Sequence, residues 1–194
     1  DAARELDQRG FVFLFAPHYH PAFARVAPVR KELGIRTLFN LMGPLLNPAG
    51  RTNQVLGVGD PAALPLLPDD LGGTGVERAL VVHGYGGYDE LSPFGPNDCV
   101  LVKDGQRRNM TIDPAELGFS RHDEAKVCVG ADRDEAVAAL KAVLDGGGEQ
   151  AMRDMVALNL AACLFLLDEG EMPACVDTAR KAVDAGLPKE VLRA

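Results

Sequence analysis

The sequence lacks the features that would place the protein in a membrane or on nucleic acid. No hydrophobic run reaches the ~18 apolar residues that a transmembrane helix requires. Positive charge is not in excess either, because 20 Lys and Arg residues stand against 28 Asp and Glu residues, for a formal net charge of −8. Nucleic-acid phosphates and anionic lipids repel such a surface. We therefore expect no nucleic acid and no membrane among the partners of the protein.

Cysteine pairs with redox or metal-ligand spacing are missing as well. The chain has no C-x-x-C pair, and three of its four cysteines lie in apolar runs; the four are Cys99, Cys128, Cys163 and Cys175. This usage is typical of small buried hydrophobic residues in a reducing compartment. We therefore expect a cytoplasmic location.

The histidines and serines form no familiar catalytic pattern. The four histidines have no metal-ligand spacing, and no Ser-His-Asp order with a nucleophile elbow is present. His18 and His20 share a loop and could contact a ligand, although two loop histidines are more often bystanders. Residues 1–5 look like the interior of a helix rather than a signal peptide or a translation start, so we expect the chain to be part of something longer.

What is present indicates an α/β fold. The chain has 194 residues, 47% of them hydrophobic, which is enough for one domain with a substantial core. Apolar runs at residues 11–15, 53–58 and 78–82 predict strands, the first of them buried on both faces. Helical segments lie between these runs, which predicts a mainly parallel sheet flanked by helices. The helix expected over residues 61–74 should be broken, because Pro65 and Pro68 interrupt it.

The second half of the chain adds a hairpin and three helices. Residues 99–103 and 107–112 flank Asp104-Gly105 and predict a β-hairpin excursion. From Asp132 onward the pattern is helical, with breaks near three consecutive glycines and before Met172. We therefore expect a helical C-terminal third.

An acidic pair follows the apolar run at residues 78–82. The chain continues through a glycine-rich turn to Asp89 and Glu90. Open α/β sheets place their chemistry where buried strands end in loops, and adjacent carboxylates are hard oxygen ligands suited to a Mg²⁺ ion shared with substrate phosphates. A solvated acidic loop is the alternative for the pair taken alone. Residues 68–75 also look like the acidic phosphate loop of the common phosphoribosyltransferase fold, but the prolines before them favour a tight turn.

Two other segments could contact a ligand. Arg30 lies between proline-bearing loops, where a guanidinium can bind a carboxylate through two parallel hydrogen bonds. Residues 39–48 combine two proline turns, a glycine and two asparagines within an apolar stretch, which suggests a rigid wall that presents backbone groups to a ligand.

Taken in order, several motifs resemble the anthranilate phosphoribosyltransferase family. They are Phe13-Leu14-Phe15-Ala16-Pro17, His20-Pro21-Ala22, residues 29–37, Phe39-Asn40, Gly43-Pro44-Leu45, Asn47-Pro48, residues 81–84, Asp89-Glu90 and Leu158-Asn159. The resemblance implies a Mg²⁺-dependent enzyme of tryptophan biosynthesis that transfers the phosphoribosyl group of phosphoribosyl pyrophosphate to anthranilate. It also implies that the full-length protein is a homodimer, and that residues 1–194 are the C-terminal portion of its large α/β domain.

The resemblance assigns a role to five residues. Arg30 would hold the anthranilate carboxylate, Gly43 and Pro44 would form the wall of the anthranilate site, and Asp89 and Glu90 would bind Mg²⁺. The glycine-rich phosphate loop and the helical domain of the family precede the point at which this chain begins, so we expect the chain alone to be inactive.

Two alternatives remain open. One is a nucleoside phosphorylase of the same fold, which the segment around Arg30 disfavours because a nucleobase offers no carboxylate. The other is a non-catalytic relative that binds nucleic acid, which the net charge of −8 disfavours.

Overall fold

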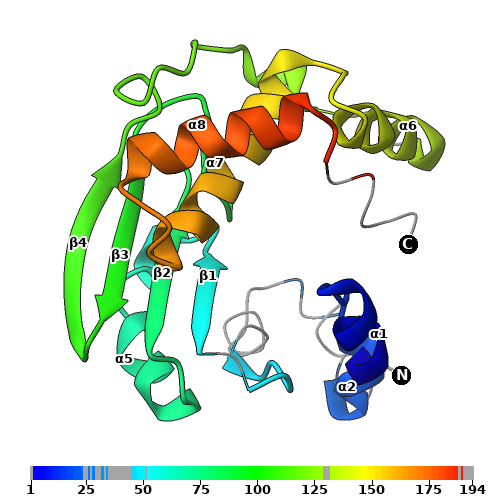
Figure 1. Ribbon diagram of the computed structural model, residues 1–194. Coiled ribbons are helices and arrows are strands. Elements are labelled where there is room, and N and C mark those ends of the chain that lie inside the picture. Colours follow the sequence, from blue (N-terminus) through cyan, green and yellow to red (C-terminus); the bar gives the residue numbers. More distant parts are fainter. Residues whose placement is uncertain are drawn as a thin grey trace. The chain divides into compact units, whose positions relative to one another are not determined.

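The computed structural model describes residues 2–23, 26, 28, 32, 34, 45–50, 52–128, 132–187 and 189. The chain divides into two compact units, residues 1–50 together with residue 194, and residues 51–193 (Figure 1). Each unit is described by itself. No helix in the described part of the chain has both the length and the hydrophobicity needed to cross a bilayer.

The first unit contains two described helices, α1 (Ala2–Arg9) and α2 (Ala16–Tyr19). Helix α1 is followed by Gly10, whose φ of 67° is left-handed and whose N–H donates to Leu6 O at 2.8 Å. The strand predicted over residues 11–15 is wrong: the segment is irregular, and Phe13 is 76% exposed. Apolar composition alone does not make a strand, since a strand needs a partner backbone. No described strand pairs with this segment.

The second unit is built on a four-stranded sheet in the order β1-β2-β3-β4. Its strands are β1 (Asn53–Gly57), β2 (Arg78–His83), β3 (Asn97–Lys103) and β4 (Gln106–Ile112). Strands β1 and β2 are parallel, whereas β2–β3 and β3–β4 are antiparallel. The α/β class is confirmed. The described sheet is mixed rather than mainly parallel, because the predicted hairpin joins this same sheet instead of leaving it.

Strand β2 lies at the centre of the core. Its residues 79–82 are fully buried, as expected for a continuous apolar run with both faces covered. Leu80 and Val82 belong to the cluster shared with the C-terminal helices, while α5 (Leu67–Leu71) also contacts β2. The connection from β1 to β2 is broken as predicted, into the short 3-10 turns η1 (Pro61–Ala63) and η2 (Gly72–Thr74) on either side of α5.

The hairpin of β3 and β4 turns at Asp104 and Gly105. Their φ values of 54° and 70° are both left-handed, which is the requirement of a type I′ turn whose twist matches the flanking strands. Strand β4 lies at the edge of the described sheet, and its residues 106–109 are exposed and polar. Such residues on an edge strand disfavour pairing with other chains.

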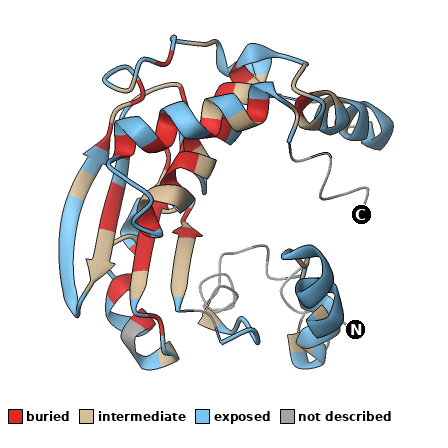
Figure 2. Ribbon diagram, in the orientation of Figure 1, coloured by how far each residue is buried: buried red, intermediate tan, exposed pale blue. Residues whose placement is uncertain are grey.

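The C-terminal part is helical, as predicted, with α6 (Arg133–Leu144), α7 (Gln150–Leu166) and α8 (Met172–Asp184). A short 3-10 turn, η3 (Glu124–Lys126), precedes them. Helices α7 and α8 pack against each other and bury small and apolar residues with β2 and β3 (Figure 2). The apolar residues of α6 are only partly buried, since Val143 is enclosed and Leu140 is 57% exposed.

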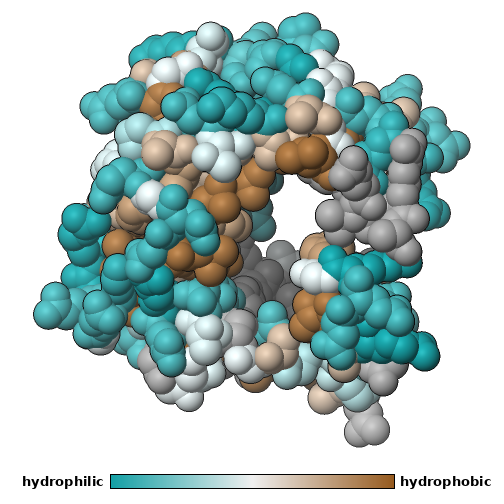
Figure 3. All heavy atoms as spheres, in the orientation of Figure 1, coloured by the Kyte–Doolittle hydropathy of each residue, from teal (hydrophilic) through white to brown (hydrophobic). Residues whose placement is uncertain are grey.

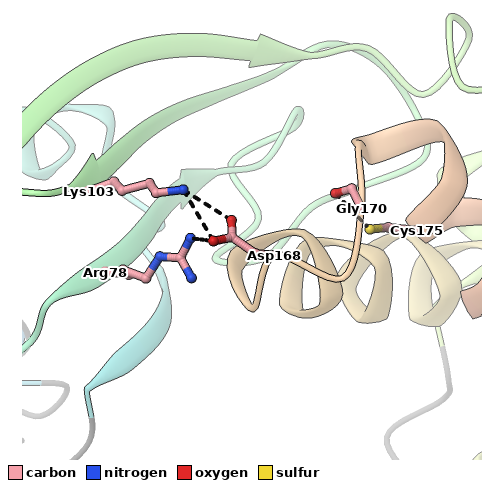
Figure 4. A network of polar contacts seen from close by, with 5 residues as sticks. All are labelled: Arg78, Lys103, Asp168, Gly170 and Cys175. Atoms are coloured by element: carbon pink, nitrogen blue, oxygen red, sulfur yellow. Dashed lines mark hydrogen bonds and ion pairs between the residues drawn. The ribbon is translucent and has the colours of Figure 1, made fainter.

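Polar contacts at both ends of α7 connect it to the rest of its unit. Asp168, just beyond the helix, forms ion pairs with Arg78 of β2 and with Lys103 of β3, the latter at 3.1 Å (Figure 4). Buried Asp154 accepts from His122 at 2.6 Å, which ties the β4–α6 connection to the helix. Helix α7 also has exposed apolar residues, such as Val156. Figure 3 shows hydrophobic surface where this helix lies.

Candidate functional site

The acidic pair lies on the loop of residues 84–96, which connects β2 to β3. The loop folds back over the carboxyl ends of the parallel strands β1 and β2, and two glycines allow this close approach. A Cβ on Gly57 would lie 1.5 Å from the carbonyl oxygen of Asp89, and a Cβ on Gly84 would lie 2.0 Å from that of Glu90. The acidic pair is therefore held at the edge of the sheet where open α/β folds bind ligands.

The loop is held from its inner side by one buried asparagine. The side chain of Asn97 is fully buried at the start of β3. Its Oδ1 accepts from Ser92 N at 2.8 Å and from Tyr85 N at 3.2 Å. The two hydrogens of its Nδ2 have three carbonyl oxygens within hydrogen-bond distance, those of Ser92, Gly95 and Ile112. One side chain thus provides both acceptor positions of its oxygen and both hydrogens of its NH₂ group to backbone groups that the irregular loop would otherwise leave unpaired.

Helix α7 holds the other side of the loop through Asn159. The Oδ1 atom of Asn159 accepts from Leu91 N at 2.9 Å, and its Nδ2 donates to Leu91 O at 2.8 Å. The same Nδ2 lies 3.4 Å from Oε2 of Glu90. Residues on both sides of the acidic pair are therefore fixed to buried secondary structure, while Asp89 and Glu90 themselves are exposed.

The electrostatics of the pair suit a cation. Partial burial of its carboxyl group, followed by the negative charge of Asp89, raises the pKa of Glu90. Neither carboxylate forms an ion pair with a described Lys or Arg. Two hard oxygen donors with uncompensated charge fit Mg²⁺, which is commonly bound by one or two carboxylates plus water and substrate phosphate oxygens.

The described residues contain no cluster of three or more His, Cys, Asp or Glu residues that could hold a metal by themselves.

The structure does not place the residues predicted to bind anthranilate, whereas it describes both histidines considered as ligand contacts. Arg30, Gly43 and Pro44 lie outside the described residues. His18 packs edge-on against Phe15, so its described contact is to an aromatic ring of its own unit.

The acidic segment at residues 68–75 does not follow a strand. Asp69 lies on α5 and pairs with Arg107 of β4 at 3.0 Å, and Gly75 has a left-handed φ of 81°. The turn favoured by the sequence is confirmed.

Sequence reasoning missed most of the residues that support the acidic pair. Gly57 ends an apolar strand, and a strand glycine often marks a close backbone approach, so this signal was available. Asn97 is followed by Asp98 ahead of an apolar run, and nothing in that pattern distinguishes it from an ordinary polar residue at the start of a strand. Asn159 was noted as part of a motif, but nothing in the sequence connected it to a loop some 70 residues away.

Known proteins resemble this chain over nearly its whole length. Residues 1–188 match the model of the glycosyl transferase family, a/b domain. The chain belongs to this family. Two curated relatives are the anthranilate phosphoribosyltransferases of Nitratidesulfovibrio vulgaris, 49% identical over 96% of this chain, and of Parasynechococcus marenigrum, 44% identical over 92% of it. The resemblance read from the sequence is confirmed.

Solved structures of anthranilate phosphoribosyltransferases agree with the fold. Anthranilate phosphoribosyltransferase from Thermus thermophilus superposes with a TM-score of 0.89 at 37% identity, covering 99% of this chain and 56% of that one. The Saccharomyces cerevisiae enzyme in complex with phosphoribosyl pyrophosphate and Mg superposes with a TM-score of 0.84 at 27% identity, covering 94% and 53%. The chain covers 57% of the N. vulgaris relative, so it spans a little over half the length of such proteins.

Proposed function

We propose that the complete protein is an anthranilate phosphoribosyltransferase. It transfers the phosphoribosyl group of phosphoribosyl pyrophosphate to the amine of anthranilate, with release of pyrophosphate, in tryptophan biosynthesis. The observation that carries the proposal is the exposed pair Asp89-Glu90 at the carboxyl ends of parallel strands, in a chain 49% identical to an enzyme of that name.

Asp89 and Glu90 would hold Mg²⁺ in the complete enzyme. The ion, when bound, neutralises the negative charge that develops on the departing pyrophosphate. The task of the chain itself is to hold the two carboxylates together at the strand ends. The backbone contacts at Gly57 and Gly84 support this role, because they leave the loop little room to move towards the sheet.

Anthranilate binding is assigned to Arg30, Gly43 and Pro44 on the strength of the resemblance. A guanidinium suits a carboxylate because two parallel hydrogen bonds fix its orientation. The amine of anthranilate is already a free nucleophile, so positioning matters more than a strong base. For this reason no side chain of the chain is assigned as a catalytic acid or base.

The proposal extends to the domain organisation, the oligomeric state and the cellular location of the protein. Residues 1–194 form part of a phosphoribosyltransferase and nucleoside phosphorylase-like catalytic domain, the complete protein is a homodimer, and this chain alone does not turn over. A cytoplasmic location fits the free thiols of Cys99 and Cys175.

The test uses the complete protein with anthranilate, phosphoribosyl pyrophosphate and Mg²⁺, and follows the loss of anthranilate fluorescence. Asp89→Asn and Glu90→Gln should each lower kcat/KM by about a hundredfold or more. Asp104→Asn, in the hairpin turn, is the matched control and should retain full activity. Consumption of nucleoside and phosphate in place of anthranilate would instead identify a nucleoside phosphorylase and overturn the proposal.

A further inference from the structure

Asn159 occupies an unusual position for a polar residue in an apolar helix. It lies in α7 between Leu158, which is fully buried, and Leu160, and its side chain points out of the helix to the loop of residues 84–96. Its Oδ1 accepts from Leu91 N at 2.9 Å while its Nδ2 donates to Leu91 O at 2.8 Å. The amide thus pairs with both backbone groups of one residue, as a neighbouring strand would.

The residue that Asn159 fixes is the one directly after the acidic pair. Leu91 is fully buried, so its backbone N–H and C=O would be left without partners if the amide were removed. On the other side of the pair, the carbonyl oxygens of Asp89 and Glu90 lie against Gly57 and Gly84. The peptide that carries both carboxylates is therefore enclosed between the strand ends and α7.

The hydrogen bonds of the Asn159 amide leave the carboxylate of Glu90 free to bind a cation. An asparagine NH₂ group has two hydrogens, and Nδ2 of Asn159 has three acceptors within reach. Two are carbonyl oxygens, Leu91 O at 2.8 Å and Met155 O at 2.9 Å, and the third is Oε2 of Glu90 at 3.4 Å. The carboxylate receives the weakest of the three contacts. The amide therefore orients the Glu90 carboxylate without occupying its oxygen atoms.

We infer that Asn159 is the positioning residue of the divalent-cation loop. It sets the place and orientation of the Glu90 carboxylate through Leu91, without binding the cation itself. Side chains that orient metal ligands by hydrogen bonding, without contacting the metal, commonly contribute ten- to a hundredfold to metal affinity. This inference rests on the proposed function, because it takes Asp89 and Glu90 to be the residues that bind Mg²⁺.

The test measures metal affinity and loop protection in the complete protein. Asn159→Ala removes the amide, and Asn159→Leu removes it while retaining the side-chain volume, so that at least one variant should fold. Mn²⁺, titrated by electron paramagnetic resonance with phosphoribosyl pyrophosphate present, should bind both variants about tenfold or more weakly than wild type. Hydrogen–deuterium exchange of the peptide spanning residues 84–96 should accelerate.

Val176→Ala provides the matched control. This residue is buried in α8 and belongs to the same hydrophobic cluster as Leu91, but its apolar side chain forms no hydrogen bond, so its truncation destabilises the same core while leaving the amide of Asn159 in place. Mn²⁺ affinity should stay within about twofold of wild type. In the Asn159 variants the KM for Mg²⁺ should rise while saturating Mg²⁺ restores most of kcat, and a merely structural defect would not be rescued in this way.

The outcomes separate this inference from the proposed function. Wild-type protein that binds no Mn²⁺ and consumes no anthranilate would overturn the proposed function. Wild-type protein that is active and binds Mn²⁺, together with Asn159 variants whose Mn²⁺ affinity matches that of Val176→Ala, would overturn the positioning role alone.

Discussion

Gly57 of β1 and Asp89 of the acidic loop are so close that no side chain fits between them. A Cβ at position 57 would lie 1.5 Å from the carbonyl oxygen of Asp89, which is backbone and cannot rotate away. Glycine is therefore needed at the end of β1 because the loop packs against it, and not because the strand itself needs a glycine.

Gly57→Ala should accordingly destabilise the complete protein and displace the acidic pair. We expect a loss of at least about 3 kcal/mol in the free energy of unfolding, the upper end of typical overpacking costs. Gly73→Ala is the control, since a Cβ there meets nothing within 4 Å, and it should stay within about 1 kcal/mol of wild type. Urea denaturation measures both, and equal midpoints for the two variants would contradict the close approach.

Asn97→Ala should weaken the loop from its inner side. The substitution leaves the N–H groups of Tyr85 and Ser92 without their acceptor, and each unsatisfied buried donor costs about 1–3 kcal/mol. We expect a total loss of about 3 kcal/mol. Asn109→Ala, at an exposed position of β4, should change the stability by less than about 0.5 kcal/mol. Similar losses in the two variants would show that the network around Asn97 does not hold the loop.

The ion pairs of Asp168 predict a dependence of stability on pH. Hydrogen bonds from Arg78 and then from Lys103 hold the pKa of Asp168 below its ordinary value of 3.8. Because the folded pKa is the lower one, the contribution to stability is present above pH 3.8 and is lost as the pH falls through the folded pKa. The effect should be modest, since Asp168 is solvent-exposed.

Asp168→Asn isolates this contribution, because asparagine tolerates the left-handed φ of 60° at this position. Wild type should be more stable than the variant at neutral pH, and the difference should vanish on acidification. Asp104→Asn, at another left-handed aspartate, controls for the backbone. Thermal unfolding as a function of pH provides the measurement, and a difference that persists in acid would exclude the ion pairs as its source.

The cysteines should differ sharply in reactivity. Burial, followed by the charge of Asp98, raises the pKa of Cys99 to about 12, so almost no thiolate forms near neutral pH. Cys128 is exposed and should be labelled first by a thiol reagent, with Cys99 reacting only after unfolding. Peptide mapping after timed labelling measures the order, and early modification of Cys99 would contradict its burial.

Local patterns were sufficient for the elements whose partners lie nearby in the chain. The hairpin was predictable because Asp104-Gly105 favours the left-handed turn that its two strands need. The broken helix before β2 followed from Pro65 and Pro68. The segment at residues 11–15 shows the limit, because its apolar pattern is that of a strand and yet Phe13 is 76% exposed. Strand formation depends on a partner that the segment itself cannot supply.

The sequence by itself determined the α/β class, the helical C-terminal third and the candidate role of Asp89 and Glu90, since these depend on residue type, order and local spacing. Only the tertiary structure showed that Gly57, Asn97 and Asn159 hold the acidic pair. These three residues come from a strand end, a strand start and a distant helix. Hydrogen bonds and close packing between such elements depend on distances in space, and these are set by how the whole core packs.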